Sequence, residues 1–183
     1  MAVELFLGGA RSGKSSFAEQ RALHYLKQSS ACQLHYIATA TPFDDEMRQR
    51  IIHHQNRRGS EWQNHETPLR LANQLATFDR HDIVLVDCLT LWINNVIYNQ
   101  GEPITEAQIT AQVTELVSAL DSSKATILCV SNEVGLGIVP MGEVSRLFVD
   151  HAGWMNQAVA KIARQVTFMA AGLPMCLKGQ DAQ

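Results

Sequence analysis

The sequence lacks several features that define special classes of protein. No apolar run approaches the roughly 20 residues of a transmembrane helix, so we expect no membrane span. The four cysteines are scattered without C-x-x-C spacing, which argues against a disulfide framework or a zinc site and predicts reduced packing residues. The net charge is only −3, so no basic excess indicates nucleic acid or a membrane surface as a partner.

Signals that would divide the chain are also missing. There are no internal repeats, low-complexity tracts or interdomain linkers, and the first residues lead directly into an apolar strand pattern rather than a signal peptide. An apolar content of 46% over 183 residues is enough for a substantial core. We therefore predict a single domain over residues 1–183 and a cytoplasmic location.

The most informative segment that is present fits the phosphate-binding pattern G-x-x-x-x-G-K-[ST]. It follows an apolar run at 3–7 and precedes a helical pattern at about 14–28, which is the context this motif requires. The alternative is an ordinary Gly/Ser turn before an amphipathic helix. We predict a polyphosphate site in which Lys14 reaches the β- and γ-phosphates and the Ser15 hydroxyl holds Mg²⁺. The predicted nucleotide-binding residues here are Gly8, Gly9, Ala10, Arg11, Ser12, Gly13, Lys14 and Ser15.

The rest of the chain alternates between strand and helix patterns. This alternation predicts an α/β fold, with a mostly parallel sheet and helices on both faces. Ligands of such folds bind at the carboxyl ends of the strands. We therefore expect the phosphate loop, Thr39, Asp87 and Glu133 to converge on one edge of the sheet. Strands are predicted at 3–7, 33–39, 62–67, 83–87, 125–130, 166–170 and 175–177, and helices at 14–28, 41–57, from 68 onward, 89–97, 105–120 and 143–164, the last with a possible break near Gly153.

Two groups outside the loop are candidates for chemistry. Asp87 ends an apolar strand, as a magnesium-linked aspartate would, although such a residue can also cap the following helix. Arg50, His53 and Arg57 share one face of the predicted 41–57 helix. Cations beside His53 would keep its imidazole neutral and nucleophilic, ready to attack an α-phosphate. The alternative is a solvated basic helix with an incidental histidine pair.

The remaining polar and aromatic residues give weaker signals. Glu66 could read the N1/N2 edge of guanine or be a surface charge, and Glu133 begins a loop that could touch substrate or be a structural crossover. No other histidine has metal-ligand spacing, so we expect these to be surface or satisfied polar residues: His24, His35, His65, His81 and His151. Trp62, Trp92 and Trp154 are predicted packing residues.

Several of these segments together resemble one known family, the bifunctional adenosylcobinamide kinase / adenosylcobinamide-phosphate guanylyltransferases of cobalamin assembly. The resemblance covers nearly the whole chain. The segments are the phosphate loop at 8–15, Tyr-Ile-Ala-Thr at 36–39, Asp-Asp-Glu-Met at 44–47, Arg-Ile-Ile-His-His at 50–54, Val-Asp-Cys-Leu-Thr at 86–90 and Asn-Glu-Val-Gly-Leu-Gly-Ile-Val-Pro at 132–140. The last loop and the His-His segment are the most specific.

The resemblance implies a RecA-like P-loop core and a two-step enzyme. ATP or GTP would phosphorylate adenosylcobinamide with Mg²⁺ held by Ser15 and Asp87, and GTP would then guanylylate the product through a covalent intermediate on His53. It also implies homo-oligomers, often trimers, and further nucleotide contacts from Thr39, Ala40, Thr41, Arg57, Arg58, Glu66 and Asp87. The rival functions are a nucleotide-dependent switch or assembly ATPase, against which the absent Asn-Lys-x-Asp motif argues, and a simple small-molecule kinase without the histidine step.

Overall fold

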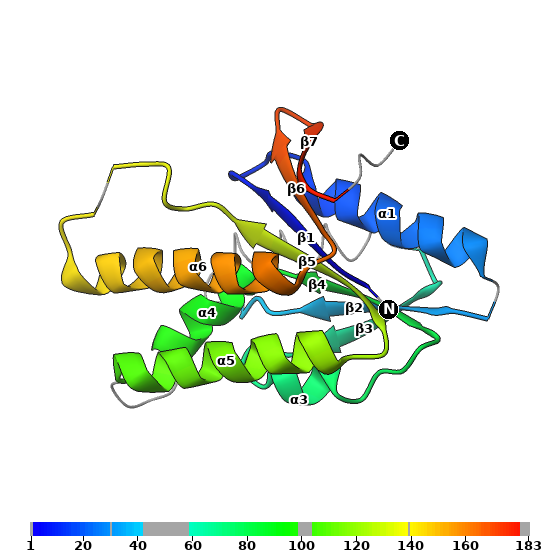
Figure 1. Ribbon diagram of the computed structural model, residues 1–183, viewed down its shortest axis with the longest axis horizontal. Helices are drawn as coiled ribbons and strands as arrows, with labels where there is room; N and C mark the ends of the chain where they lie inside the picture. Colours follow the sequence, from blue (N-terminus) through cyan, green and yellow to red (C-terminus); the bar gives the residue numbers. More distant parts are fainter. Residues whose placement is uncertain (1, 30, 42–58, 99–103, 139, 180–183) are drawn as a thin grey trace.

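The structure is a computed structural model that describes residues 2–29, 31–41, 59–98, 104–138 and 140–179. Strands and helices alternate along most of the chain (Figure 1). Residues 42–58 lie outside the described residues, and they include His53, Arg57, Arg58 and all but the first residue of the predicted 41–57 helix. The elements are β1 Ala2–Gly8, α1 Lys14–Gln28, β2 Gln33–Ala38, β3 Trp62–Glu66, α3 Leu71–Leu75, β4 Asp82–Asp87, α4 Leu89–Tyr98, α5 Glu106–Ser122, β5 Thr126–Asn132, α6 Glu143–Ile162, β6 Gln165–Ala170 and β7 Leu173–Lys178.

The strands form one seven-stranded sheet in the order β3-β2-β4-β5-β1-β6-β7. All neighbours pair in parallel except β6 and β7, which form an antiparallel hairpin at one edge. The predicted α/β class with a mostly parallel sheet is therefore confirmed. The polar segment at 62–67 supplies β3, the opposite edge strand, as its low apolar content suggested.

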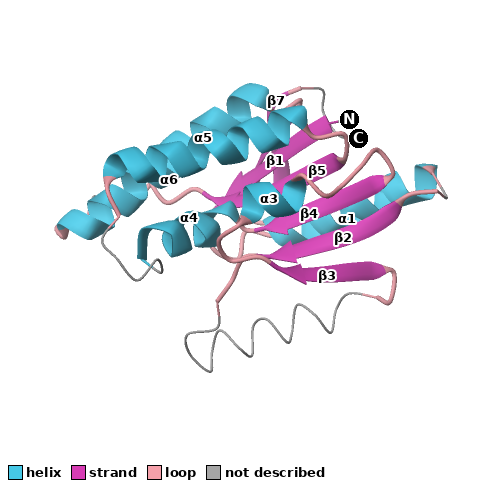
Figure 2. Cartoon of the chain, turned by 90° about the horizontal axis from the view of Figure 1, so that it is seen from below, coloured by secondary structure: helices cyan, strands magenta, loops and turns pink. Residues whose placement is uncertain are grey.

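Helices cover both faces of the sheet, which confirms the prediction from the alternating pattern. Figure 2 shows α3, α4, α5 and α6 on one face and α1 on the other. Each face has its own hydrophobic core. The larger core includes Leu89, Trp92 and Met155, whereas the smaller core includes Phe6, Ala18 and Trp62 beneath α1. Among the described residues, no helix has the length and apolar character needed to cross a membrane.

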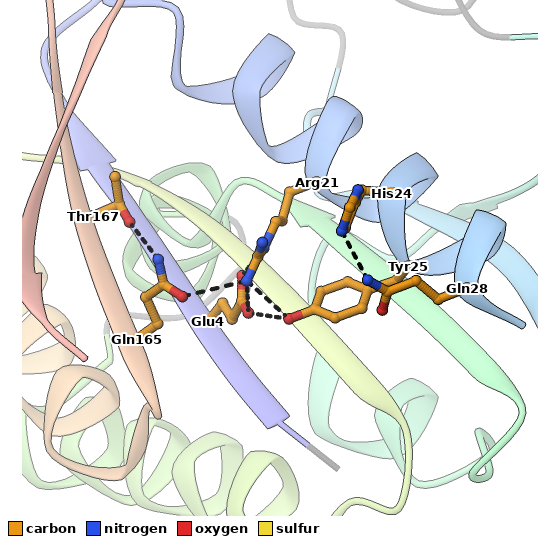
Figure 3. Close-up of polar contacts among 7 residues, drawn as sticks. All are labelled: Glu4, Arg21, His24, Tyr25, Gln28, Gln165 and Thr167. Carbon is orange, nitrogen blue, oxygen red and sulfur yellow. Dashed lines mark hydrogen bonds and ion pairs between the residues drawn. The ribbon is translucent and has the colours of Figure 1, made fainter. Parts of the chain in front are cut away.

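The helix α1, which follows the phosphate loop, is fixed to the sheet by a buried ion pair (Figure 3). Glu4 of β1 is 1% exposed, and Arg21 donates to both of its carboxylate oxygens at 3.0 and 3.1 Å. The Tyr25 hydroxyl donates to the same carboxylate, and Gln165 of β6 accepts from Arg21 at 3.4 Å. The bond to Glu4 raises the pKa of Arg21, and burial together with Glu4 raises the pKa of Tyr25. A buried carboxylate paired this fully locks α1 in register against β1 and β6.

Three local expectations are wrong. Helix α6 continues through Gly153 without a break, because its apolar face packs on both sides of that residue. Trp154 is 55% exposed rather than a packing residue, since it lies on the outer face of α6. The turn between the last strands is Ala171–Gly172, both with positive φ, so Leu173 and Pro174 belong to β7 rather than to the turn.

Candidate functional site

The predicted convergence of strand ends is confirmed by the strand register. Gly8 of β1 pairs with Asn132 of β5, and Ala38 of β2 pairs with both Asp87 of β4 and Glu66 of β3. The backbone N–H of Glu133 donates to the carbonyl of Gly8 at 3.2 Å. One edge of the sheet therefore holds the phosphate loop and three carboxylates, those of Glu66, Asp87 and Glu133.

The phosphate loop has the backbone that its glycines predict. Gly8 and Gly13 have φ of 154° and 93°, and Arg11 also has a positive φ of 55°. A Cβ on Gly8 would lie 2.5 Å from the carbonyl oxygen of Met169, so only glycine fits there. Gly13 caps α1, whose positive end therefore faces the loop. This is the concave arrangement of N–H groups that binds phosphates at a helix N-terminus.

Two polar side chains of the loop are buried. Lys14 is 7% exposed and donates to the carbonyl of Gly9 at 2.8 Å. Burial lowers the pKa of Lys14, and the nearby Asp87 carboxylate opposes this shift. The Ser12 hydroxyl is buried and has no hydrogen-bond partner among the described residues. A phosphate oxygen would provide the acceptor that the Ser12 hydroxyl lacks and an ion-pair partner for the Lys14 amine.

Asp87 is half-buried at the end of β4 and is oriented by Tyr36 of β2, whose hydroxyl donates to Oδ2 at 3.1 Å. The next residue, Cys88, is buried, and burial raises the pKa of its thiol to about 12. Cys88 is therefore a neutral packing residue at physiological pH, as expected for a cysteine without a metal or disulfide partner. Asp87 thus provides a negative charge that acts on Lys14 and raises the pKa of its amine against the effect of burial.

Thr39 lies one residue after β2 and is fully buried. Its hydroxyl donates to the Cys88 carbonyl at 2.7 Å and accepts from the Cys88 N–H at 2.9 Å. The described position of Thr39 therefore gives its side chain a positioning role, joining the ends of β2 and β4. Ala40 and Thr41, the other predicted contacts in this segment, are half-buried.

Asn95 of α4 is a functional candidate that the sequence did not reveal. It is 1% exposed, and its side-chain amide donates to the carbonyls of Thr39 at 2.7 Å and of Pro68 at 3.2 Å. These carbonyls belong to the segments that follow β2 and β3. Asn95 therefore holds together the two connections that carry Thr39–Thr41 and Glu66. A pair of adjacent asparagines in an apolar helix was the available signal, but the partners of Asn95 are 27 and 56 residues away.

A second buried network supports the ends of β4 and β5. The Ser131 hydroxyl donates to Asn156 of α6 at 2.7 Å and lies 3.1 Å from the hydroxyl of Thr90. Thr90 accepts from the backbone N–H of Asn132 at 2.6 Å, and Asn156 donates to the Asn132 carbonyl at 3.2 Å. These bonds fix the start of the loop at Glu133, which lies beside Gly8.

The other predicted site residues differ in where they lie. Glu66 is exposed at the carboxyl end of β3, two strands away from Asp87, so its side chain is accessible to a ligand at this edge. His53, Arg57 and Arg58 lie outside the described residues, and their predicted roles stay predictions.

Among the remaining histidines, two are joined in a buried chain. His35 lies 3.1 Å from both Asp82 and His65. Burial and the neighbouring His35 lower the pKa of His65. His151 is buried against Trp154, and its Nε2 has no hydrogen-bond partner among the described residues, so the expectation of a surface or satisfied histidine is wrong there.

The oxygen ligands that Mg²⁺ prefers are available at this edge. Ser15 is the first-turn hydroxyl of α1, and the carboxylate of Asp87 is held in place by Tyr36. Within the described ranges, no cluster of three or more His, Cys, Asp and Glu side chains could hold a metal by itself. The residues therefore fit a magnesium ion that is bound mainly through nucleotide phosphates, not an all-protein metal cage.

Comparison with known proteins agrees with this geometry. The profile of a family described as CobU, cobinamide kinase / cobinamide phosphate guanyltransferase, matches residues 4–177. The bifunctional adenosylcobalamin biosynthesis protein CobP of Pseudomonas aeruginosa is 44% identical over 178 residues, covering 97% of this chain and 98% of that protein. The bifunctional adenosylcobalamin biosynthesis protein CobU of Escherichia coli is 35% identical, with 95% and 98% covered.

Among solved structures, the flagellar accessory protein FlaH from Methanocaldococcus jannaschii has a TM-score of 0.54 at 13% sequence identity. The alignment covers 98% of this chain and 79% of FlaH. At this identity the similarity concerns the fold alone.

Proposed function

We propose that this chain, which belongs to the cobinamide kinase / cobinamide phosphate guanyltransferase family, phosphorylates adenosylcobinamide and then transfers a guanylyl group to the product. The observation that carries the proposal is the family match over residues 4–177, in a chain whose phosphate loop, Asp87 and Glu66 lie on one sheet edge. The curated relatives cover nearly the same length, so the whole activity is expected here.

In the first step, the aminopropanol hydroxyl of adenosylcobinamide attacks the γ-phosphorus of ATP or GTP. The bond from that phosphorus to the bridging oxygen breaks, the nucleoside diphosphate leaves, and the hydroxyl proton is released to solvent. The loop N–H groups, the Ser12 hydroxyl and Lys14 bind the phosphate oxygens and stabilise the charge of the transition state. Magnesium on Ser15 and Asp87 would shield the triphosphate charge.

In the second step, a nitrogen of His53 attacks the α-phosphorus of GTP and pyrophosphate leaves. A phosphate oxygen of adenosylcobinamide phosphate then attacks the guanylyl phosphorus, the P–N bond breaks, and adenosyl-GDP-cobinamide forms with the imidazole restored. A covalent stage of this kind divides one difficult displacement into two easier ones. Glu66, exposed at the same edge, is proposed to accept hydrogen bonds from guanine N1 and N2, and Arg57 and Arg58 to bind phosphate.

Two further properties belong to this proposal. We expect a homo-oligomer, with a trimer as the leading candidate from the family resemblance. We also expect a cytoplasmic enzyme, because its nucleotide substrates are supplied there.

The test is covalent labelling with GTP that carries radioactive α-phosphate. The protein is incubated with the nucleotide, denatured, and the adduct is exposed to acid and to alkali. We expect a label that is lost in acid, survives alkali, and is absent from His53→Ala but present in the control His54→Ala, whose position on the apolar stripe of the predicted helix indicates packing. Equal labelling of His53→Ala would remove the assignment, and an unlabelled wild-type protein would favour the plain kinase or the nucleotide switch.

A further inference from the structure

The segment between β5 and α6, which starts at the sheet edge that holds the phosphate loop, exposes large apolar side chains. Leu136 is 79% exposed, Ile138 99% and Met141 96%, and Val144 in the first turn of α6 is 51% exposed. We call these four residues the apolar loop. Single exposed apolar residues are ordinary, but four within nine positions are a local concentration that indicates a binding segment.

Hydrogen bonds fix the backbone of the segment that carries the apolar loop, while its apolar side chains face solvent. Arg146 of α6 donates to the carbonyls of Pro140, at 3.4 Å, and Met141. The Tyr98 hydroxyl of α4 donates to the carbonyl of Val144 at 3.2 Å. At the other end, the Gly135 N–H donates to the Glu133 carboxylate at 3.0 Å. The bonds use the backbone of the segment, so its apolar side chains are left for a ligand.

The segment that carries the apolar loop starts next to the place where phosphoryl transfer is proposed. Its first residue is Glu133, whose N–H donates to the carbonyl of Gly8 in the phosphate loop. Leu136 is three residues further on, so its Cα lies at most about 11 Å from that of Glu133. Figures 1 and 2 show that the loop and the N-terminal half of α6 extend beyond the carboxyl ends of the strands.

Nucleotide phosphates and a guanine base do not call for an apolar surface of this kind. The other substrate in the proposed function does, because a corrin is a broad macrocycle whose rim is rich in methyl groups as well as amides. We propose that the apolar loop binds the corrin ring of adenosylcobinamide and so directs its aminopropanol hydroxyl toward the γ-phosphate at Lys14. This inference rests on the proposed function and adds to it the surface that recognises the corrinoid.

The segment that carries the apolar loop is hydrogen-bonded to the phosphate loop. This connection favours a substrate, rather than a second copy of the chain, as the molecule that binds the apolar loop. Apolar side chains on a segment that starts at the phosphate loop suit a large molecule whose hydroxyl must reach the γ-phosphate. Another exposed apolar row, Leu173, Met175 and Leu177 on edge strand β7, lies in the antiparallel hairpin and provides a matched comparison.

The experiment measures steady-state kinase kinetics with adenosylcobinamide and GTP for Ile138→Ser and Met141→Ser, with Met175→Ser as the control. Both loop side chains are almost fully exposed, so the variants should fold normally. We expect KM for adenosylcobinamide to rise about tenfold in each loop variant, since apolar contact area with the ring is lost. KM for GTP, covalent labelling by GTP without corrinoid, and the native mass should be unchanged. Met175→Ser should behave as wild type.

The outcomes separate this inference from the function on which it rests. A wild-type protein that neither phosphorylates adenosylcobinamide nor becomes labelled by GTP would overturn the proposed function itself. An active wild type with unchanged corrinoid KM in both loop variants would overturn the binding surface alone. A reduced native mass in the loop variants, by size exclusion with light scattering, would show that a second copy covers the patch and would also overturn the inference.

Discussion

Replacing Asn95 with leucine tests whether one buried amide holds the edge of the nucleotide site together. Leucine has a similar volume but no donor, so the carbonyls of Thr39 and Pro68 would lose their bonds of 2.7 and 3.2 Å. Each buried acceptor left unsatisfied costs about 1–3 kcal/mol. Burying leucine recovers roughly 1–2 kcal/mol, so the net loss of unfolding free energy lies between about 0 and 5 kcal/mol, with a central value of about 2–3 kcal/mol.

The same substitution should weaken nucleotide binding, because the segments that carry Thr39–Thr41 and Glu66 would no longer be fixed to α4. We expect the Kd for GTP to rise about tenfold, which corresponds to 1.4 kcal/mol. Urea denaturation measures the stability and calorimetric titration measures the affinity. Asn94→Leu, at the half-buried neighbouring position, is the control. Wild-type affinity in folded Asn95→Leu, or equal losses in both variants, would refute the reasoning.

Three further predictions concern the loop, the metal and pH. Gly13→Ala should lower the free energy of unfolding by about 1–3 kcal/mol, because φ at Gly13 is 93° and a Cβ there would lie 3.2 Å from the β6–β7 turn. The control Gly9→Ala, where a Cβ would meet open space, should cost less in the same urea denaturation. Tyr36→Phe frees Asp87, so kinase assays should need about three- to tenfold more Mg²⁺ for half-maximal rate. The pKa of His65 is lower in the folded chain than in the unfolded chain, so the unfolded chain binds more protons below about pH 6.5. The free energy of unfolding should therefore decline as the pH falls below about 6.5, and it should decline less in His65→Gln.

Much of the fold followed from local patterns in the sequence. The run Ile83–Asp87 is uniformly apolar until its final carboxylate, and it forms β4 with its first four residues buried and Asp87 at the edge. Because parallel strands share the direction of their carboxyl ends, placing the phosphate loop, Asp87 and Glu133 on strand ends also placed them together. Prediction succeeded where the hydrophobic pattern of one segment and the common direction of parallel strands were sufficient.

The failures have two causes, the phase of a helix and contacts between distant segments. The sequence around Trp154 has the composition of a packed helix, yet helix phase turns that ring outward while His151 turns inward. Asn95 resembles an ordinary polar position within α4, and only the assembled sheet edge brings the carbonyls of Thr39 and Pro68 to it. No window of local sequence contains both members of such a pair, so periodicity could not reveal them.

The way that buried polar groups are paired distinguishes the site from the scaffold. At the opposite end of β1, Glu4 is buried with Arg21, Tyr25 and Gln165 arranged around it, which is the pattern of a structural ion pair. At the carboxyl edge, the Ser12 hydroxyl is buried without a partner among the described residues, and Lys14 is held where burial lowers its pKa. Such groups reduce stability in the folded chain and would be satisfied by an anion, so the local conflicts with folding occur where the nucleotide is proposed to bind.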